Sequence, residues 1–198
     1  MGGTTLIATF YSYKPFFAGA HAFSPKNIIL VSPANLPSKE ENDVKKAFEE
    51  VKKNFGEVAK IRMVRLDEKN ILKVASETAK LLEQNSGAIV NISGAWKLLA
   101  QGVLYGCYAR PDYVKKIVCN IIDMKDFVEL PKLSYGLSTA KKELLERISK
   151  RNGKSIAQIA DELDKTPGML YQHLKELKSL GFVDEEFKIT MAGRLGLL

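Results

Sequence analysis

Two short stretches of the sequence hold the residue types that bind a phosphate and a base. The first is residues 91–97 (NISGAWK), which follow an apolar, β-branched run. Gly94 lets a phosphate approach backbone N–H groups, Lys97 adds positive charge, and Ser93 can cap a following helix. Trp96 can stack on a base. This stretch therefore predicts a site for an anion or a nucleotide.

The second stretch is residues 11–16 (YSYKPF), which follow the apolar run 4–10 (TTLIATF). It offers two tyrosine rings, a serine hydroxyl and the cation of Lys14. In an open α/β sheet, ligands bind outside the carboxyl ends of the strands, where the strand order reverses. We expect the first and fourth strands to flank that point, so that both stretches line one site.

Each of these residues also has a purely structural interpretation. Trp96 can fill a core, one of Tyr11 and Tyr13 can pack, and Lys14 and Lys97 can be solvated surface lysines. The dinucleotide fingerprint G-x-G-x-x-G and the phosphate-binding P-loop are both absent, so no NAD or ATP cofactor is expected.

Cysteine and histidine chemistry is not expected either. Cys107 and Cys119 lie in apolar sequence without C-x-x-C spacing, which favours structural thiols over a metal site or a disulfide. His21 and His173 fit packing positions. We also expect a cytoplasmic protein, because the sequence shows no secretory signal or transmembrane run.

The predicted elements of the first domain, residues 1–129, alternate between strand and helix. Apolar runs at 4–10, 28–31, 88–92 and 117–122 suit strands buried on both faces, and 58–66 suits a strand nearer an edge. Helical patterns lie between them; one begins with a capping box of Ser38 and Glu41. This predicts an α/β fold, a Rossmann-like, doubly wound and mostly parallel sheet. Further helices are expected at 70–82 and 95–109, and a last strand at 127–130.

After a linker at 130–137, residues 138–198 predict a small α+β winged helix-turn-helix domain. Ser155 and Gln158 form a capping box, Thr166 caps a second helix with Pro167 in its first turn, and Gly181 ends it. A helix at 138–150 precedes this pair, and a short hairpin at 182–190 follows it.

The run at 166–183, T-P-x-x-L-x-x-H-L-K-x-L-x-x-L-G-F-V, resembles the winged helices of MarR-like and related prokaryotic regulators. The resemblance implies binding of double-stranded DNA, with the second helix in the major groove, where Gln reads adenine and Lys meets phosphate. The alternative is a dimerisation or docking module without DNA. The candidate DNA-binding residues are Thr166, Gly168, Met169, Tyr171, Gln172, Lys175 and Lys188.

The net charge of +7 suits a polyanionic partner, but it is not concentrated in the winged helix. Residues 138–198 carry 11 Lys or Arg against 9 Asp or Glu, which leaves +5 of the net charge on the first part of the chain. The prediction of DNA binding therefore depends on the sequence pattern, and the first domain is the more basic one.

Residues 9–20 (TFYSYKPFFAGA), residues 91–102 (NISGAWKLLAQG) and the winged helix together resemble the archaeal CRISPR-associated regulators with a CARF domain. That family usually shows a G-G-T-[KR]-like sequence at the position of residues 94–97, and here Ala95 and Trp96 replace its second glycine and its threonine. The resemblance implies a homodimer that binds a cyclic oligoadenylate, typically cyclic tetra-adenylate. The implied ligand contacts are Tyr11, Ser12, Tyr13, Lys14, Ser93, Gly94, Ala95, Trp96 and Lys97.

Three functions fit these observations. The first is a ligand-gated transcription regulator of CRISPR-associated genes. The second is an enzyme that cleaves cyclic oligoadenylate; a ribonuclease with an Arg-x4-6-His pair is disfavoured, because neither histidine follows an arginine at that spacing. The third is a regulator that senses an unrelated metabolite in the same cleft.

Overall fold

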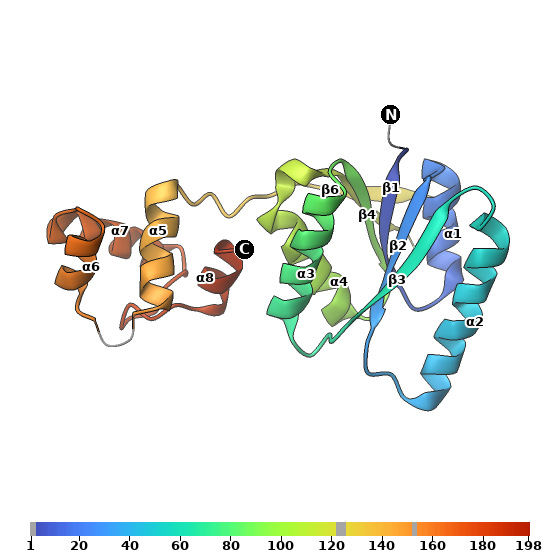
Figure 1. Cartoon of the computed structure of the whole chain (residues 1–198), viewed down its shortest axis with the longest axis horizontal. Helices are drawn as coiled ribbons and strands as arrows, with labels where there is room; N and C mark the ends of the chain where they lie inside the picture. Colours follow the sequence, from blue (N-terminus) through green and yellow to red (C-terminus); the bar gives the residue numbers. More distant parts are fainter. Residues whose placement is uncertain (1–2, 122–125, 152–153) are drawn as a thin grey trace. The chain divides into compact units, whose positions relative to one another are not determined.

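The computed structural model describes residues 3–121, 126–151 and 154–198 (Figure 1). The chain divides between Ser134 and Tyr135 into two compact units, each with its own hydrophobic core. Ile122, which the sequence assigns to the end of a strand, lies outside the described residues.

The first unit is built on one six-stranded sheet with the order β3-β2-β1-β4-β5-β6. Strands β1 to β5 are parallel to their neighbours, and β6 pairs antiparallel with β5. The strand order reverses between β1 and β4, as expected. The strands are β1 (Thr5–Phe10), β2 (Asn27–Pro33), β3 (Lys60–Leu66), β4 (Ala88–Gly94), β5 (Val114–Asn120) and β6 (Phe127–Leu130).

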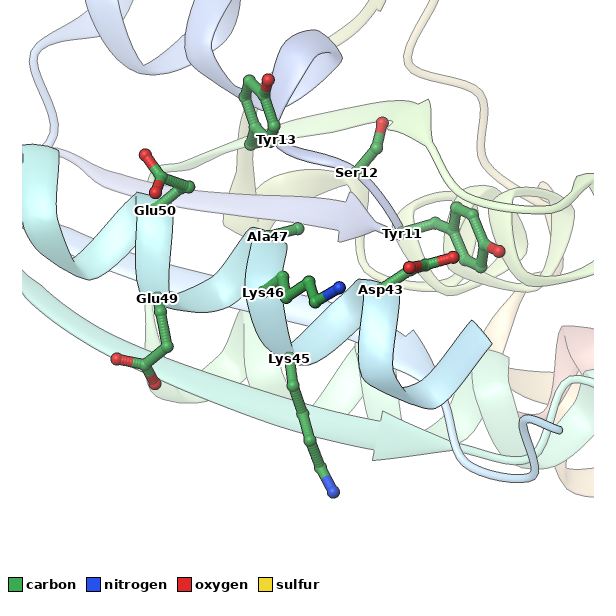
Figure 2. Close-up of a pocket in the computed structure, with 9 residues that line it drawn as sticks. All are labelled: Tyr11, Ser12, Tyr13, Asp43, Lys45, Lys46, Ala47, Glu49 and Glu50. Atoms are coloured by element: carbon green, nitrogen blue, oxygen red, sulfur yellow. The ribbon is translucent and has the colours of Figure 1, made fainter. Parts of the chain in front are cut away.

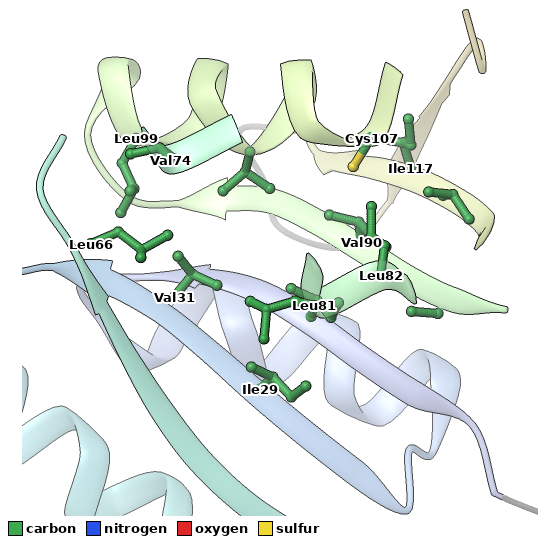
Figure 3. Packing of buried hydrophobic residues seen from close by; sticks show 14 residues of the cluster. Ile29, Val31, Leu66, Val74, Leu81, Leu82, Val90, Leu99, Cys107 and Ile117 are labelled. Atoms are coloured by element: carbon green, nitrogen blue, oxygen red, sulfur yellow. The ribbon is translucent and has the colours of Figure 1, made fainter. Parts of the chain in front are cut away.

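Helices cover both faces of this sheet, which confirms the doubly wound α/β fold. One core joins the sheet to α1 and α2 through residues such as Phe16 and Val44, and the other joins it to α3 and α4 through residues such as Val74 and Leu99. Figure 3 shows the α3 and α4 side. The helices are α1 (Tyr13–Phe23), α2 (Ser38–Phe55), α3 (Ile71–Gln84), α4 (Lys97–Ala109) and the short 3-10 helix η1 (Pro111–Tyr113).

The start of α2 differs from the predicted capping box. Ser38 is already the first helical residue, Pro37 occupies the N-cap position, and no side chain caps the helix. Glu41 accepts a hydrogen bond from Arg65 on β3 at 3.0 Å instead. The guanidinium therefore takes the carboxylate that the capping box would have used.

The second unit contains the predicted helix-turn-helix. Helices α5 (Thr139–Ser149), α6 (Ile156–Glu162) and α7 (Pro167–Ser179) pack around a core that includes Leu145, Leu170 and Leu174. The capping box at the start of α6 is confirmed: the Gln158 N–H donates to the Ser155 hydroxyl at 3.2 Å, and the Ser155 N–H donates to the Gln158 side chain at 2.8 Å.

The predicted hairpin is reduced to a turn with one antiparallel bridge, Val183 to Ile189. Its tip is held by the Asp184 carboxylate, which accepts hydrogen bonds from the backbone N–H groups of Glu186 and Lys188 at 2.9 and 2.8 Å. A further helix that the sequence did not predict, α8 (Met191–Gly196), follows the turn.

Gly94→Ala is expected to destabilise the first unit. A Cβ at Gly94 would lie 2.2 Å from the carbonyl oxygen of Thr9 on β1, and a backbone atom cannot move aside without disturbing the strand pair. We expect the free energy of unfolding to fall by about 3 kcal/mol in urea titration. Gly168→Ala is the control, because nothing lies within 4 Å of its added methyl group and its stability should not fall.

Candidate functional site at the carboxyl edge of the sheet

The two predicted ligand-binding stretches meet at the carboxyl edge of β1 and β4. The rings of Tyr11, directly after β1, and Trp96, directly before α4, have centroids 5.7 Å apart and planes inclined by 35°. The Trp96 side chain remains 40% exposed, so it is not a core residue. The structure thus forms one aromatic contact from two segments that are 85 residues apart in sequence.

The helices that follow these segments both begin with an exposed lysine in the first turn. Neither N-cap residue, Ser12 for α1 or Trp96 for α4, accepts a hydrogen bond from the first turn, and neither first turn contains an acidic residue. Each carries an exposed lysine instead, Lys14 and Lys97. A cation near a helix N-terminus is unfavourable, whereas an anion there is stabilised by the helix dipole and by open N–H groups. An anionic ligand would satisfy both helices.

Ser93 does not have the role predicted from the sequence. The N-cap of α4 is Trp96, and Ser93 lies inside β4. Its hydroxyl lies 2.6 Å from the Asn91 side-chain oxygen and 2.8 Å from that of Asn120, and it accepts a hydrogen bond from the Asn120 N–H at 2.7 Å. The hydroxyl is therefore used within the protein.

Gly94 is also structural. It is the last residue of β4, and its N–H donates to the Thr9 hydroxyl at 3.0 Å. The lack of a side chain serves the close approach of β1, and this N–H is not available to a phosphate. Ala95 follows it as a half-buried residue packed against the core on the α3 and α4 side.

Asn120, at the end of β5, was missed from the sequence. Its side-chain amide donates to the Pro15 carbonyl in the first turn of α1 at 3.0 Å, and its side-chain oxygen accepts from the Asn91 amide at 3.1 Å. The signal available was a pair of asparagines, Asn91 and Asn120, in otherwise apolar strands, since buried polar groups need partners.

A pocket of about 650 Å³ opens between the second stretch, residues 11–16, and α2 (Figure 2). Tyr11, Ser12 and Tyr13 line one side of it. Burial first, and then the charges of Glu40 and Asp43, raise the pKa of Tyr11, so its hydroxyl stays protonated. The sequence analysis did not predict this pocket. The α2 residues that line it are Asp43, Lys45, Lys46, Ala47, Glu49 and Glu50.

Helix α7, which the sequence predicts to enter the major groove, has one buried and one exposed face as expected. Leu170 and Leu174 are fully buried, whereas Met169 and Tyr171 are 51% and 47% exposed. Thr166 accepts a hydrogen bond from the backbone N–H of Met169 at 3.4 Å. The remaining candidates on this helix, Gly168, Gln172 and Lys175, are exposed as well.

Two of the DNA-binding candidates already have partners in the protein. The side chain of Gln172 hydrogen-bonds to Glu176, whose pKa is lowered first by the hydrogen bond and charge of Lys141 on α5. Lys188 pairs with Glu186 in the turn, and this contact raises the pKa of Lys188. Lys188 can therefore bind a phosphate only if its ion pair with Glu186 breaks.

The sequence of the second unit also matches a family model. Residues 139–185 match the model of the bacterial regulatory protein, arsR family. With α5, α6, α7 and the bridged turn in place, the second unit is a winged helix-turn-helix domain of the regulator type. Comparison with curated proteins gives no match to the chain.

Two solved structures share the fold over most of the chain. One is Can2 from Sulfobacillus thermosulfidooxidans in complex with cyclic tetra-adenylate, with 15% identity and a TM-score of 0.51 over 97% of this chain. The other is Enterococcus italicus Csm6 bound to cyclic hexa-2′-fluoro-hexa-dAMP, with 10% identity and a TM-score of 0.54 over 90% of this chain. The matches cover 61% and 56% of those two proteins.

The described part of the chain shows neither a metal-binding cluster nor a membrane-spanning helix. No group of three or more His, Cys, Asp or Glu side chains there is placed to hold a metal ion. None of its helices is long and apolar enough to cross a membrane. The thiol of Cys107 lies in the core, where burial raises its pKa to about 12 and keeps it protonated.

Stability measurements should separate the structural residues from the candidate ligand contacts. Ser93→Ala leaves the Asn120 N–H without its acceptor, so we expect a loss of about 1–3 kcal/mol in the free energy of unfolding. Lys97→Ala removes an exposed cation from a helix N-terminus and should change stability by less than about 0.5 kcal/mol. Urea titration of both variants checks this. A larger loss for Lys97→Ala than for Ser93→Ala would contradict these roles.

Proposed function

We propose that the protein is a dimeric, ligand-responsive DNA-binding transcription regulator of CRISPR-associated genes that senses a cyclic oligoadenylate, with cyclic tetra-adenylate as the expected ligand. The observation that carries the proposal is the combination of a regulator-type winged helix with a unit whose fold recurs in two proteins solved with such ligands. The first unit acts as a CARF-type sensor and the second as the DNA reader.

The geometry of the carboxyl edge supports a ring-shaped polyanion. Lys14 and Lys97 stand in the first turns of two helices without acidic residues, and Tyr11 and Trp96 offer rings between them. A two-fold dimer presents two copies of this edge, and a cyclic tetranucleotide has the same symmetry. One ring would then be bound by two chains.

The ligand test is calorimetric titration with cyclic tetra-adenylate. We expect one ring per two chains, and Lys97→Ala should weaken binding about tenfold or more, because a charge-assisted contact to phosphate is lost. Lys115→Ala is the matched control. This exposed lysine lies near the start of β5, at the opposite edge of the parallel sheet, and its replacement should leave the affinity unchanged.

Two results would change the proposal. If the wild type shows no heat of binding, the sensor role fails and only DNA binding remains. If linear adenylate fragments appear during incubation with the ring, the first unit is an enzyme. The hydroxyl of Ser93 has no part in such a reaction, because its hydrogen bonds are made within the sheet.

The DNA-reading role depends on the exposed face of α7. Lys175 is exposed on that face, and Tyr171 contacts the turn through Phe187, with ring centroids 6.4 Å apart. No arginine lies on α7, so strong guanine readout is not expected. The acidic turn adds repulsion from phosphates. Together these features predict a modest affinity that depends strongly on salt.

The DNA test uses a duplex selected from a random-sequence pool and fluorescence anisotropy at several salt concentrations. Lys175→Ala should weaken binding to all sequences and reduce the slope of log K against log salt by about 1. Gln172→Ala should mainly weaken discrimination at one base pair. Lys142→Ala, an exposed lysine on α5, serves as the control. Unchanged binding of both α7 variants would assign the DNA contact to another surface.

A further inference from the structure

The pocket between the second stretch and α2 differs chemically from the basic edge formed by Lys14 and Lys97. Its α2 side carries the carboxylates of Asp43, Glu49 and Glu50 against the ammonium groups of Lys45 and Lys46. Two of these charges are paired along the helix, Lys45 with Glu41 at 3.7 Å and Glu49 with Lys52 at 2.9 Å. Asp43 and Glu50 also line this side against Lys46, so it is not a cationic site that favours a phosphate, and the two sides of this loop must contact different parts of a ligand.

The pocket walls suit a flat, uncharged ring. Tyr11 and Tyr13 contribute aromatic rings, and the buried methyl group of Ala47 leaves room between them and α2. Tyr13 is itself packed on Phe17, with ring centroids 5.3 Å apart, so this wall is supported from behind. A volume of about 650 Å³ is ample for a nucleobase.

The polar groups at one end of the pocket define which ring fits. Figure 2 shows the Asp43 carboxylate beside the Tyr11 ring, with the Lys46 ammonium extending toward it. The charge of Asp43 contributes to the raised pKa of Tyr11, which agrees with this proximity. A carboxylate only accepts hydrogen bonds, so it selects a base that carries an exocyclic amino group, and Lys46 can donate to a neighbouring ring nitrogen.

We propose that this pocket binds an aminopurine base of the nucleotide ligand, with the exocyclic amino group donating to Asp43. The inference rests on the proposed function for the identity of the whole ligand. The base lies between Tyr11, Tyr13 and α2, while the phosphates lie at the first turns of α1 and α4. Tyr11 separates the two environments, since it lines the pocket and also contacts Trp96.

The test compares two nucleosides that differ only in the amino group, adenosine and purine riboside. Binding is followed by NMR of the full chain with labelled alanine methyl groups, where the Ala47 methyl reports on the pocket and the Ala160 methyl, buried in the second unit, should not respond. We expect adenosine to bind about tenfold more tightly than purine riboside, as a hydrogen bond to a charged group is gained.

Asp43→Ala should abolish this difference and leave the affinity for purine riboside unchanged, because only the acceptor is removed. Asp43 is exposed, so the fold should be retained. Glu77→Ala is the matched control: it removes an exposed carboxylate from α3, on the other face of the sheet, and should keep the tenfold preference.

The inference is overturned if adenosine does not shift the Ala47 methyl, or if the preference for adenosine survives in Asp43→Ala. These results are independent of the titration with cyclic tetra-adenylate. If the ring binds but leaves the Ala47 methyl unshifted, the base pocket is wrong and the proposed function stands. If the ring does not bind but adenosine shows the expected preference, the proposed sensor function fails and the base pocket stands.

Discussion

The contact between β1 and β4 at the carboxyl edge of the sheet determines where the candidate site lies. The register of the two strands is broken between Ala8 and Phe10, and Thr9 spans the break. Its hydroxyl donates to the Asn91 carbonyl and accepts from the Gly94 N–H, while its own carbonyl occupies the space that a side chain at residue 94 would need. As a result, β1 and β4 end at nearly the same level of the sheet. Tyr11 and Trp96, which follow these strands, are therefore in contact.

A polar network beneath this edge fixes the start of α1. Asn91 is almost fully buried, so its amide must find partners in the protein, and it finds them in Ser93 and Asn120. Asn120 in turn donates to the Pro15 carbonyl in the first turn of α1. Because several buried groups depend on one another, α1 is held in one position before any ligand arrives. This kind of preorganisation reduces the entropy cost of binding.

The sequence predicts the fold better than the site, and the reason is physical. Apolar runs such as 28–31 and the capping box of Ser155 are local signals, and the structure confirms the elements that they predict. The role of Gly94 depends instead on a neighbouring strand 85 residues away, through a register break that no local pattern shows, and the role of Ser93 depends on Asn120 at the end of β5. The pocket was missed for the same reason, since it forms between two separate elements and α2 alone resembles an ordinary solvated helix.

The distribution of charge gives a physical reason why the proposed ligand of the first unit is a nucleotide and not a simple anion. Lys14 and Lys97 stand at helix N-termini, where a bare cation is unfavourable, and a phosphate would compensate for both. The adjoining pocket offers aromatic rings and side chains of both charges, so a small anion such as sulfate would leave it empty. A molecule with phosphates at one end and an uncharged amino-substituted ring at the other satisfies both environments at once, and nucleotides combine these two groups.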